Sequence, residues 1–226
     1  MNKFILFFAG TFFLSGCIGD DLIFDEVEEA VRITNPLDQL ALGDTYQFTA
    51  VYTNNIGQTE SANINWSSSD ENLLSINSDG LATGLQKGDL TITAEVAING
   101  KTVYDTRALS VTDSTIITLP EIRMGVLEST STYQLEGSFT MREENNQIIL
   151  EFGSDYEAST ALPGLYIYLT NNPNTSVGAY EIGMVQDYSG AHAYMLPASE
   201  VELYEYSHVL YFCKPFNVKV GDGELN

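Results

Sequence analysis

The side chains best suited to chemistry are few in this sequence. Of 226 residues only two are cysteines, Cys17 and Cys213, and only two are histidines, His192 and His208. A thiolate is a nucleophile, a metal ligand and a redox group, and histidine ordinarily titrates near neutral pH. The sequence contains no G-x-S-x-G elbow, H-E-x-x-H helix, P-loop or dinucleotide fingerprint. We therefore expect a protein that is not an enzyme, and any chemistry should centre on the cysteines.

Cys17 follows an apolar segment at the N-terminus. Lys3 precedes the apolar residues 4–13, a run far shorter than the roughly 20 residues that span a bilayer. The run ends in Leu14-Ser15-Gly16-Cys17, which resembles the bacterial lipobox. The resemblance implies that residues 1–16 are a lipoprotein signal peptide and that the thiol of Cys17 carries a lipid. The mature chain would then be anchored to the outer membrane or cell surface, outside the cytoplasm.

Acidic residues dominate the rest of the chain. Lys3 is the only charged residue among the first sixteen, so removing them leaves 31 acidic and 8 basic residues and a charge of about −23. Phosphate backbones would repel such a chain, so we expect no nucleic-acid partner. Six of the acids lie between positions 20 and 29, within an expected linker over residues 17–30. This cluster also resembles surface-export signals of some lipoproteins, and the two interpretations are compatible.

The hydrophobic pattern predicts an all-β protein of two domains. Apolar residues alternate in short runs separated by Gly, Asn, Asp and Pro, and helical periodicity is nearly absent. Asn99-Gly100 lies between two such runs and predicts a type I′ hairpin turn. Ten of the thirteen tyrosines lie from Tyr133 onward. We therefore divide the chain into a domain at 31–112, a linker at 113–126 and a domain at 127–226, the latter an antiparallel β-sandwich or barrel.

The first of these segments resembles the bacterial immunoglobulin-like group 2 module. The residues that carry the resemblance are Leu42-Gly43-Asp44-Thr45, Phe48-Thr49-Ala50, Trp66-Ser67-Ser68-Ser69-Asp70, Ile76, Gly80-Leu81-Ala82-Thr83-Gly84, Gly88 and Thr91-Ile92-Thr93-Ala94. The resemblance implies an immunoglobulin-like β-sandwich that acts as a stalk or an adhesive domain. Trp66 should be its buried anchor, with Phe48 and Ile92 packed against it. Calcium binding by loop acids stays open, although no D-x-D-x-D-G run is present; the acids are Asp44, Asp70, Asp79 and Asp89.

The second segment resembles the DM-thirteen domain, an extracellular β module proposed to act in electron transfer. The resemblance rests on Gly137, Leu165 to Leu169, Gly190, Tyr194, Pro197, Gly221, Leu225 and above all the strand from Val209 to Val218 around Cys213. It implies that Cys213 is a bare redox thiol or a ligand to a prosthetic group such as haem. Two departures are Phe212, where a tryptophan is common, and Tyr133, where many members have a histidine.

Cys213 therefore has two open interpretations. As a redox or cofactor residue it would act with His192, His208 or Tyr211 as possible accessories. If Cys213 is instead only a small buried hydrophobic residue, the protein would be an adhesion or ligand-binding protein whose partner is a cell-surface protein or glycan. On a strand, Cys213 should share one face with Val209 and Tyr211. With Cys17 lipidated, Cys213 and the two histidines fall short of the four soft ligands of a structural zinc site, covalent c-type haem lacks its C-x-x-C-H motif, and the oligomeric state stays open.

Overall fold

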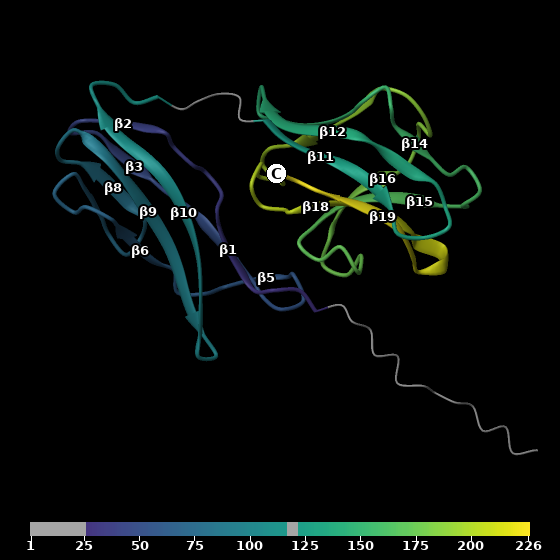
Figure 1. Cartoon of the computed structure of the whole chain (residues 1–226), viewed down its shortest axis with the longest axis horizontal. Coiled ribbons are helices and arrows are strands. Elements are labelled where there is room, and N and C mark those ends of the chain that lie inside the picture. The colour runs from purple at the N-terminus through teal and green to yellow at the C-terminus, as the bar shows by residue number, and fades with distance from the viewer. Residues whose placement is uncertain (1–25, 117–121) are drawn as a thin grey trace, which may run out of the picture.

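The computed structural model describes residues 26–116 and 122–226. Within these residues the chain forms β-strands and one short 3₁₀ helix, η1 (Lys214–Phe216), so the all-β prediction is confirmed. No helix of the described residues is long and apolar enough to cross a membrane. The strands form two bodies that lie side by side, an N-terminal and a C-terminal domain (Figure 1). The predicted signal peptide and Cys17 lie outside the described residues.

The N-terminal domain is a sandwich of small sheets whose strand orders are β1-β4-β5, β2-β10-β9-β6 and β3-β8-β7. Its described strands are β1 (Ala30–Ile33), β2 (Gln39–Ala41), β3 (Thr45–Gln47), β4 (Ala50–Thr53), β5 (Thr59–Glu60), β6 (Asn65–Ser68), β7 (Leu74–Ile76), β8 (Leu81–Gly84), β9 (Gly88–Ile98) and β10 (Lys101–Thr112). Asn99 and Gly100 both have positive φ between β9 and β10, which confirms the predicted hairpin turn.

Residues 46–52, whose inward-facing side chains recur at every second position, pass from one sheet to another. β3 pairs with β8, whereas β4 pairs with β1 and β5. The backbone of the two residues between them joins neighbouring strands, because Phe48 N donates to Gly80 O at 2.9 Å and Thr34 N donates to Thr49 O at 3.0 Å. Phe48 and Tyr52 are both buried, so the inward face continues across the change of sheet.

Trp66 is not the buried anchor that the sequence predicts. It is only half-buried, whereas Phe48 and Ile92 are fully enclosed. The reason is its position on β6, the edge strand of its sheet, where one side of the indole stays open. Its ring lies 6.0 Å from that of Phe48. The centre of the core is filled instead by Phe48, Tyr52 and the aliphatic side chains of β9.

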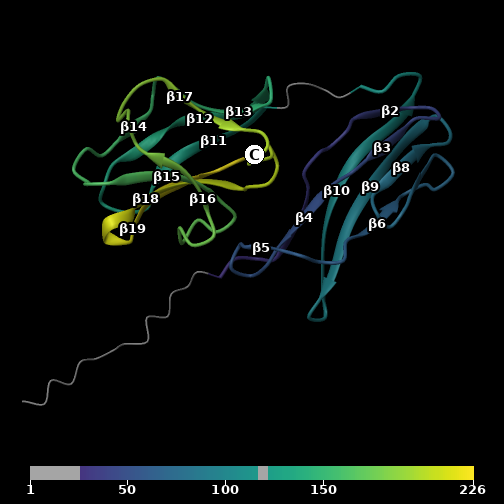
Figure 2. The same cartoon turned by 180° about the vertical axis from the view of Figure 1, so that it is seen from behind.

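The C-terminal domain is a single sheet that curls into a nearly closed barrel, with the order β16-β15-β18-β19-β11-β12-β13-β17 and β14 paired to β12 (Figure 2). Its described strands are β11 (Ile122–Ser129), β12 (Leu135–Glu144), β13 (Gln147–Phe152), β14 (Glu157–Ala158), β15 (Leu165–Thr170), β16 (Tyr180–Met184), β17 (His192–Pro197), β18 (His208–Cys213) and β19 (Val218–Glu224). β11 begins at Ile122, inside the segment expected to be a linker, because Arg123 and Leu127 already face the interior.

Side-chain contacts join the two domains. Arg32 of β1 donates to Asn171 Oδ1 at 2.5 Å, and Asn172 Nδ2 donates to Ile56 O at 3.0 Å. Gly57 lies so close to Asn172 that a Cβ at Gly57 would be 2.6 Å from the Asn172 Cβ. These contacts come from β1 and the loop between β4 and β5 on one side and from the loop after β15 on the other. The first domain is therefore docked against the second along its β1 side (Figure 1).

Candidate functional site

Cys213 lies at the end of β18 with its side chain inside the barrel. Its Cα is paired with Leu165 of β15 on one side and Val218 of β19 on the other. The residue is 0% exposed and carries a free thiol. Val209 and Tyr211 belong to the same core cluster, which confirms the predicted shared face. Solvent, a second thiol or a soluble oxidant therefore does not reach the sulfur while the barrel is closed.

The neighbouring cation does not reach this thiol either. Lys214 follows Cys213 in the chain, but its Nζ lies 2.6 Å from the carboxylate of Glu181 and 4.9 Å from the ring centroid of Tyr166. Both partners lie on the outer side of the barrel wall. The local positive charge is consequently directed away from the sulfur.

Tyr211 lies in an aromatic cluster that fills the barrel. Its ring centroid is 6.3 Å from that of Phe152 and 6.2 Å from that of Tyr156. Burial raises the pKa of the Tyr211 hydroxyl well above its ordinary value, and the adjacent Tyr156 adds to the rise. Burial also raises the pKa of Tyr156. Both phenols stay protonated across the physiological range, so they are neutral members of the core.

The two histidines have different surroundings. His192 stacks on Phe152 at 4.9 Å between ring centroids, and its Nδ1 is 2.8 Å from Gly190 O. His208 begins β18 while Cys213 ends it, so about 16 Å of strand separates them. Burial lowers the pKa of His208 below its ordinary value, and the carboxylates of Asp222 and Glu224 oppose this. The structure therefore brings His192 and Tyr211 together against the ring of Phe152 and leaves His208 at the opposite end of β18 from Cys213.

A haem or metal site at Cys213 does not fit the side chains around it. The sulfur is enclosed by packed aliphatic and aromatic groups, His208 lies at the other end of β18, and the ring of His192 packs on Phe152. Among the described residues, no group of three or more His, Cys, Asp or Glu side chains could hold a metal ion. The loop acids of the first domain have other roles: Asp70 Oδ1 accepts from Asn72 N at 2.9 Å, and Asp89 Oδ1 accepts from Ser110 Oγ at 2.6 Å.

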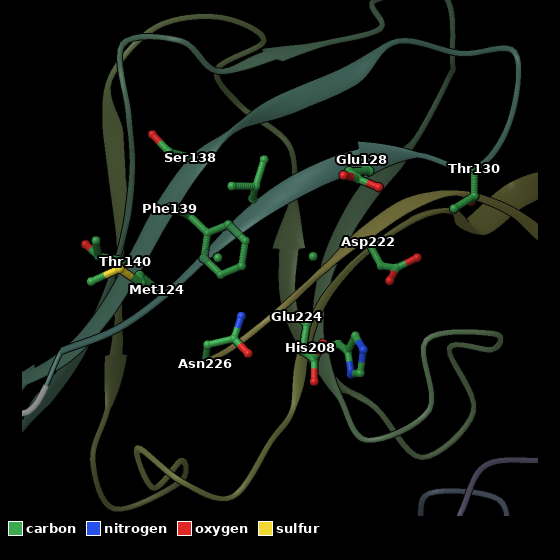
Figure 3. A pocket seen from close by; sticks show the side chains of 13 residues that line it. Met124, Glu128, Thr130, Ser138, Phe139, Thr140, His208, Asp222, Glu224 and Asn226 are labelled. Carbon is green, nitrogen blue, oxygen red and sulfur yellow. The ribbon is translucent and has the colours of Figure 1, made fainter.

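The C-terminal domain carries an open groove along β11, β12 and β19, with a volume of about 660 Å³. Figure 3 shows the ring of Phe139 in its centre, with Met124 and Thr140 toward one side and Glu128 and Asp222 toward the other. Met124 and Val126 are 57% and 59% exposed, which is unusual for apolar side chains that alternate on a strand. The groove therefore combines apolar walls with an aromatic floor.

Three glycines bring β11 and β19 close together at this groove, and two of them, Gly125 and Gly223, are among its lining residues. A Cβ at Gly125 would collide with the carbonyl oxygen of Glu224 and lie 2.5 Å from Cζ of Phe139. A Cβ at Gly223 would lie 2.6 Å from both Phe139 Cε1 and Val126 O, and one at Gly221 would collide with the carbonyl oxygen of Glu128. β11 and β19 are antiparallel neighbours in the sheet, and they can approach this closely only because the glycines have no side chain. Phe139 then packs directly beneath this close approach.

Acidic side chains line the β19 side of the groove. Glu128, Asp222 and Glu224 are among its lining residues, and none of the described lining residues is a lysine or an arginine. Lys219 lies nearby and pairs with Asp222 at 2.5 Å. Sequence reasoning missed this groove. The available signals were the spacing Gly221-x-Gly223 and the outward alternation of Ile122, Met124 and Val126.

Comparison with known families identifies part of the chain. Residues 29–106 match the family described as Bacterial Ig-like domain (group 2). The match confirms the resemblance predicted for the first domain, and the strands β1 to β9 lie within it. No curated protein matches the chain.

Proposed function

We propose that the chain is a lipid-anchored protein of the bacterial cell surface that binds a surface protein or glycan, with Cys213 as a structural side chain. The bacterial Ig-like domain at residues 29–106 supports an adhesion-type or surface-display role. The observation that carries the proposal is that the same domain buries Cys213 completely and carries an open, apolar groove elsewhere on its surface. A module built to bind has an accessible surface and a closed core, and this domain has both.

The lipid anchor rests on Leu14-Ser15-Gly16-Cys17, which follow an apolar leader. Each buried methylene contributes about 0.8 kcal/mol, so two or three acyl chains would hold the protein at a membrane without help from its acidic surface. Expression of the chain and of its Cys17→Ser variant tests this. The wild type should need detergent for release and gain the mass of the acyl chains, whereas the variant should appear in the soluble fraction. A wild-type chain that keeps residues 1–16 and carries no lipid would overturn the anchor.

Adhesion is tested by presenting the purified chain on beads to intact cells, to isolated surface proteins and to surface glycans. Retention of one of these by the chain, but not by an unrelated acidic protein of the same charge, is the expected result. The charge-matched control is needed because the chain carries a formal charge of −22 and attracts cations without specificity. If the chain retains no more material than that control does, the proposed binding function is wrong.

The electron-transfer function implied by the DM-thirteen resemblance is a second candidate. It is favoured by Tyr211, which shares the inward face with Cys213 and leads into the aromatic cluster. The visible spectrum of the chain purified from its native compartment tests it. A Soret band that is lost in Cys213→Ser would establish ligation. A colourless protein whose thiol reacts with thiol reagents only after unfolding would remove this function and leave the structural role.

A further inference from the structure

The outer face of β11 carries an apolar stripe that no part of the described chain covers. Ile122, Met124 and Val126 point outward and are 46%, 57% and 59% exposed. The residues between and after them, Arg123 and Leu127, are buried in the barrel. Alternate residues on a strand recur about every 7 Å along one face. The stripe therefore presents a row of apolar contacts with the repeat of an extended polypeptide.

The two sides of the stripe differ in chemistry. On β12, the positions paired with Met124 and Val126 are Thr140 and Ser138, which are small and uncharged. On β19, Glu224 and Asp222 line the groove, and Glu128 continues the acidic side at the end of β11. Lys219 offsets only the charge of Asp222. An occupant must therefore bring apolar groups for the stripe and positive charge for the β19 side.

From this complementarity we infer that the β11–β19 groove binds an extended segment of a partner protein that carries both apolar and basic residues on the face it presents. The inference rests on the proposed binding function and names its partner chemistry. A second copy of the chain fits poorly, because a formal charge of −22 on each copy would bring acidic surfaces together. Anionic lipid headgroups are repelled for the same reason.

The test uses the whole chain, purified as its host processes it and reconstituted in nanodiscs of zwitterionic lipid, with empty nanodiscs as the blank. The probe is a fluorescein-labelled ten-residue peptide with valine and lysine in turn at its odd positions and serine at its even positions, so that both side-chain types share one face of the extended chain. Matched probes replace every lysine by glutamate or every valine by serine. Fluorescence anisotropy should show binding of the lysine–valine probe and at least about tenfold weaker binding of each matched probe, which corresponds to about 1.4 kcal/mol.

Variants locate the binding surface. The double substitution Met124→Ser with Val126→Ser should weaken the lysine–valine probe about tenfold, since it removes two apolar contacts. Glu128→Gln with Glu224→Gln should also weaken it and should reduce its dependence on salt. The matched controls are Met195→Ser, at a residue 65% exposed on β17, and Glu143→Gln, at an exposed position of β12; both should bind as the wild type does. Circular dichroism confirms that each variant is folded.

Several results would overturn the inference. They are equal binding of the glutamate and lysine probes, unchanged binding by the Met124 and Val126 variants, and sedimentation showing a dimer that those substitutions dissolve. If the adhesion assay fails but the probe still binds, the proposed cell-surface role is wrong and peptide binding by the groove stands. If adhesion is observed but the groove variants do not affect it, the cell-surface role stands and the inference about the groove is wrong.

Discussion

The guanidinium of Arg107, on β10, lies 5.3 Å from the centroid of the Tyr204 ring in the C-terminal domain. Arg123 of β11 is at the same distance from that ring, and Tyr204 is almost fully buried. Asp105 lies 3.4 Å from Arg107 and also accepts a hydrogen bond from Ile33 N at 2.9 Å. A side chain of one domain is thus held in place by its own strands and stacked on a ring of the other domain.

Loss of this contact should loosen the docking of the two domains. A cation–π contact that is partly desolvated contributes about 1 kcal/mol. We expect Arg107→Gln to separate the thermal unfolding of the domains into two transitions and to raise the radius of gyration in solution scattering. The control is Lys87→Gln, which removes an exposed ion pair with Asp113 far from the interface and should change neither quantity. A single transition identical to the wild type would contradict a role of Arg107 in docking.

His208 should make the stability of the C-terminal domain depend on pH. Burial lowers its pKa below the ordinary 6.5, Arg32 and Lys219 reinforce the effect, and Asp222 and Glu224 oppose it. The folded state then binds this proton more weakly than the unfolded state does. The stabilising contribution of neutral His208 is therefore complete above pH 6.5 and decreases as the pH falls through 6.5 toward the folded pKa.

The measurement is the melting temperature of the wild type and of His208→Gln between pH 8 and pH 5, in buffers of constant ionic strength. Glutamine is neutral throughout, so the variant should lose less stability on acidification than the wild type does. His192→Gln is the matched control for the only other histidine. Parallel curves for the wild type and His208→Gln would show that this imidazole keeps the same pKa on folding.

The structural role of Cys213 predicts a specific order of variant stabilities. Cys213→Ala removes one sulfur from a packed core and should cost about 1 kcal/mol of unfolding free energy. Cys213→Ser places a hydroxyl among apolar groups and should cost more, about 1–3 kcal/mol. Urea denaturation measures both, with the exposed Val177→Ala as a control that should stay within about 0.5 kcal/mol of the wild type. A serine variant as stable as the wild type would show that water reaches the site of the thiol.

The sequence predicts much of this architecture because period-2 alternation directly records which face of a strand is buried. Val209, Tyr211 and Cys213 are an example, and Asn99-Gly100 predicts its turn for an equally local reason. Trp66 shows the limit: its size suggests an anchor, but whether β6 lies at an edge depends on the order of strands in the sheet. The groove was missed for the same reason. Gly125 and Gly223 are far apart in sequence, and only the pairing of β11 with β19 brings them together.

Gly125 is therefore the position where the close approach of β11 and β19 can be tested most directly. An added methyl group would collide with the carbonyl oxygen of Glu224 and lie 2.5 Å from the ring of Phe139, so β11 and β19 must separate. We expect Gly125→Ala to lower the unfolding free energy by about 1–3 kcal/mol, as overpacking in a tight core does. Thr140→Ala, on the adjacent strand, is the control for a change at the groove surface and should have little effect. Hydrogen exchange should show faster exchange in β19 for the glycine variant alone. If Gly125→Ala is as stable as the wild type, the two strands are not held together by this close approach.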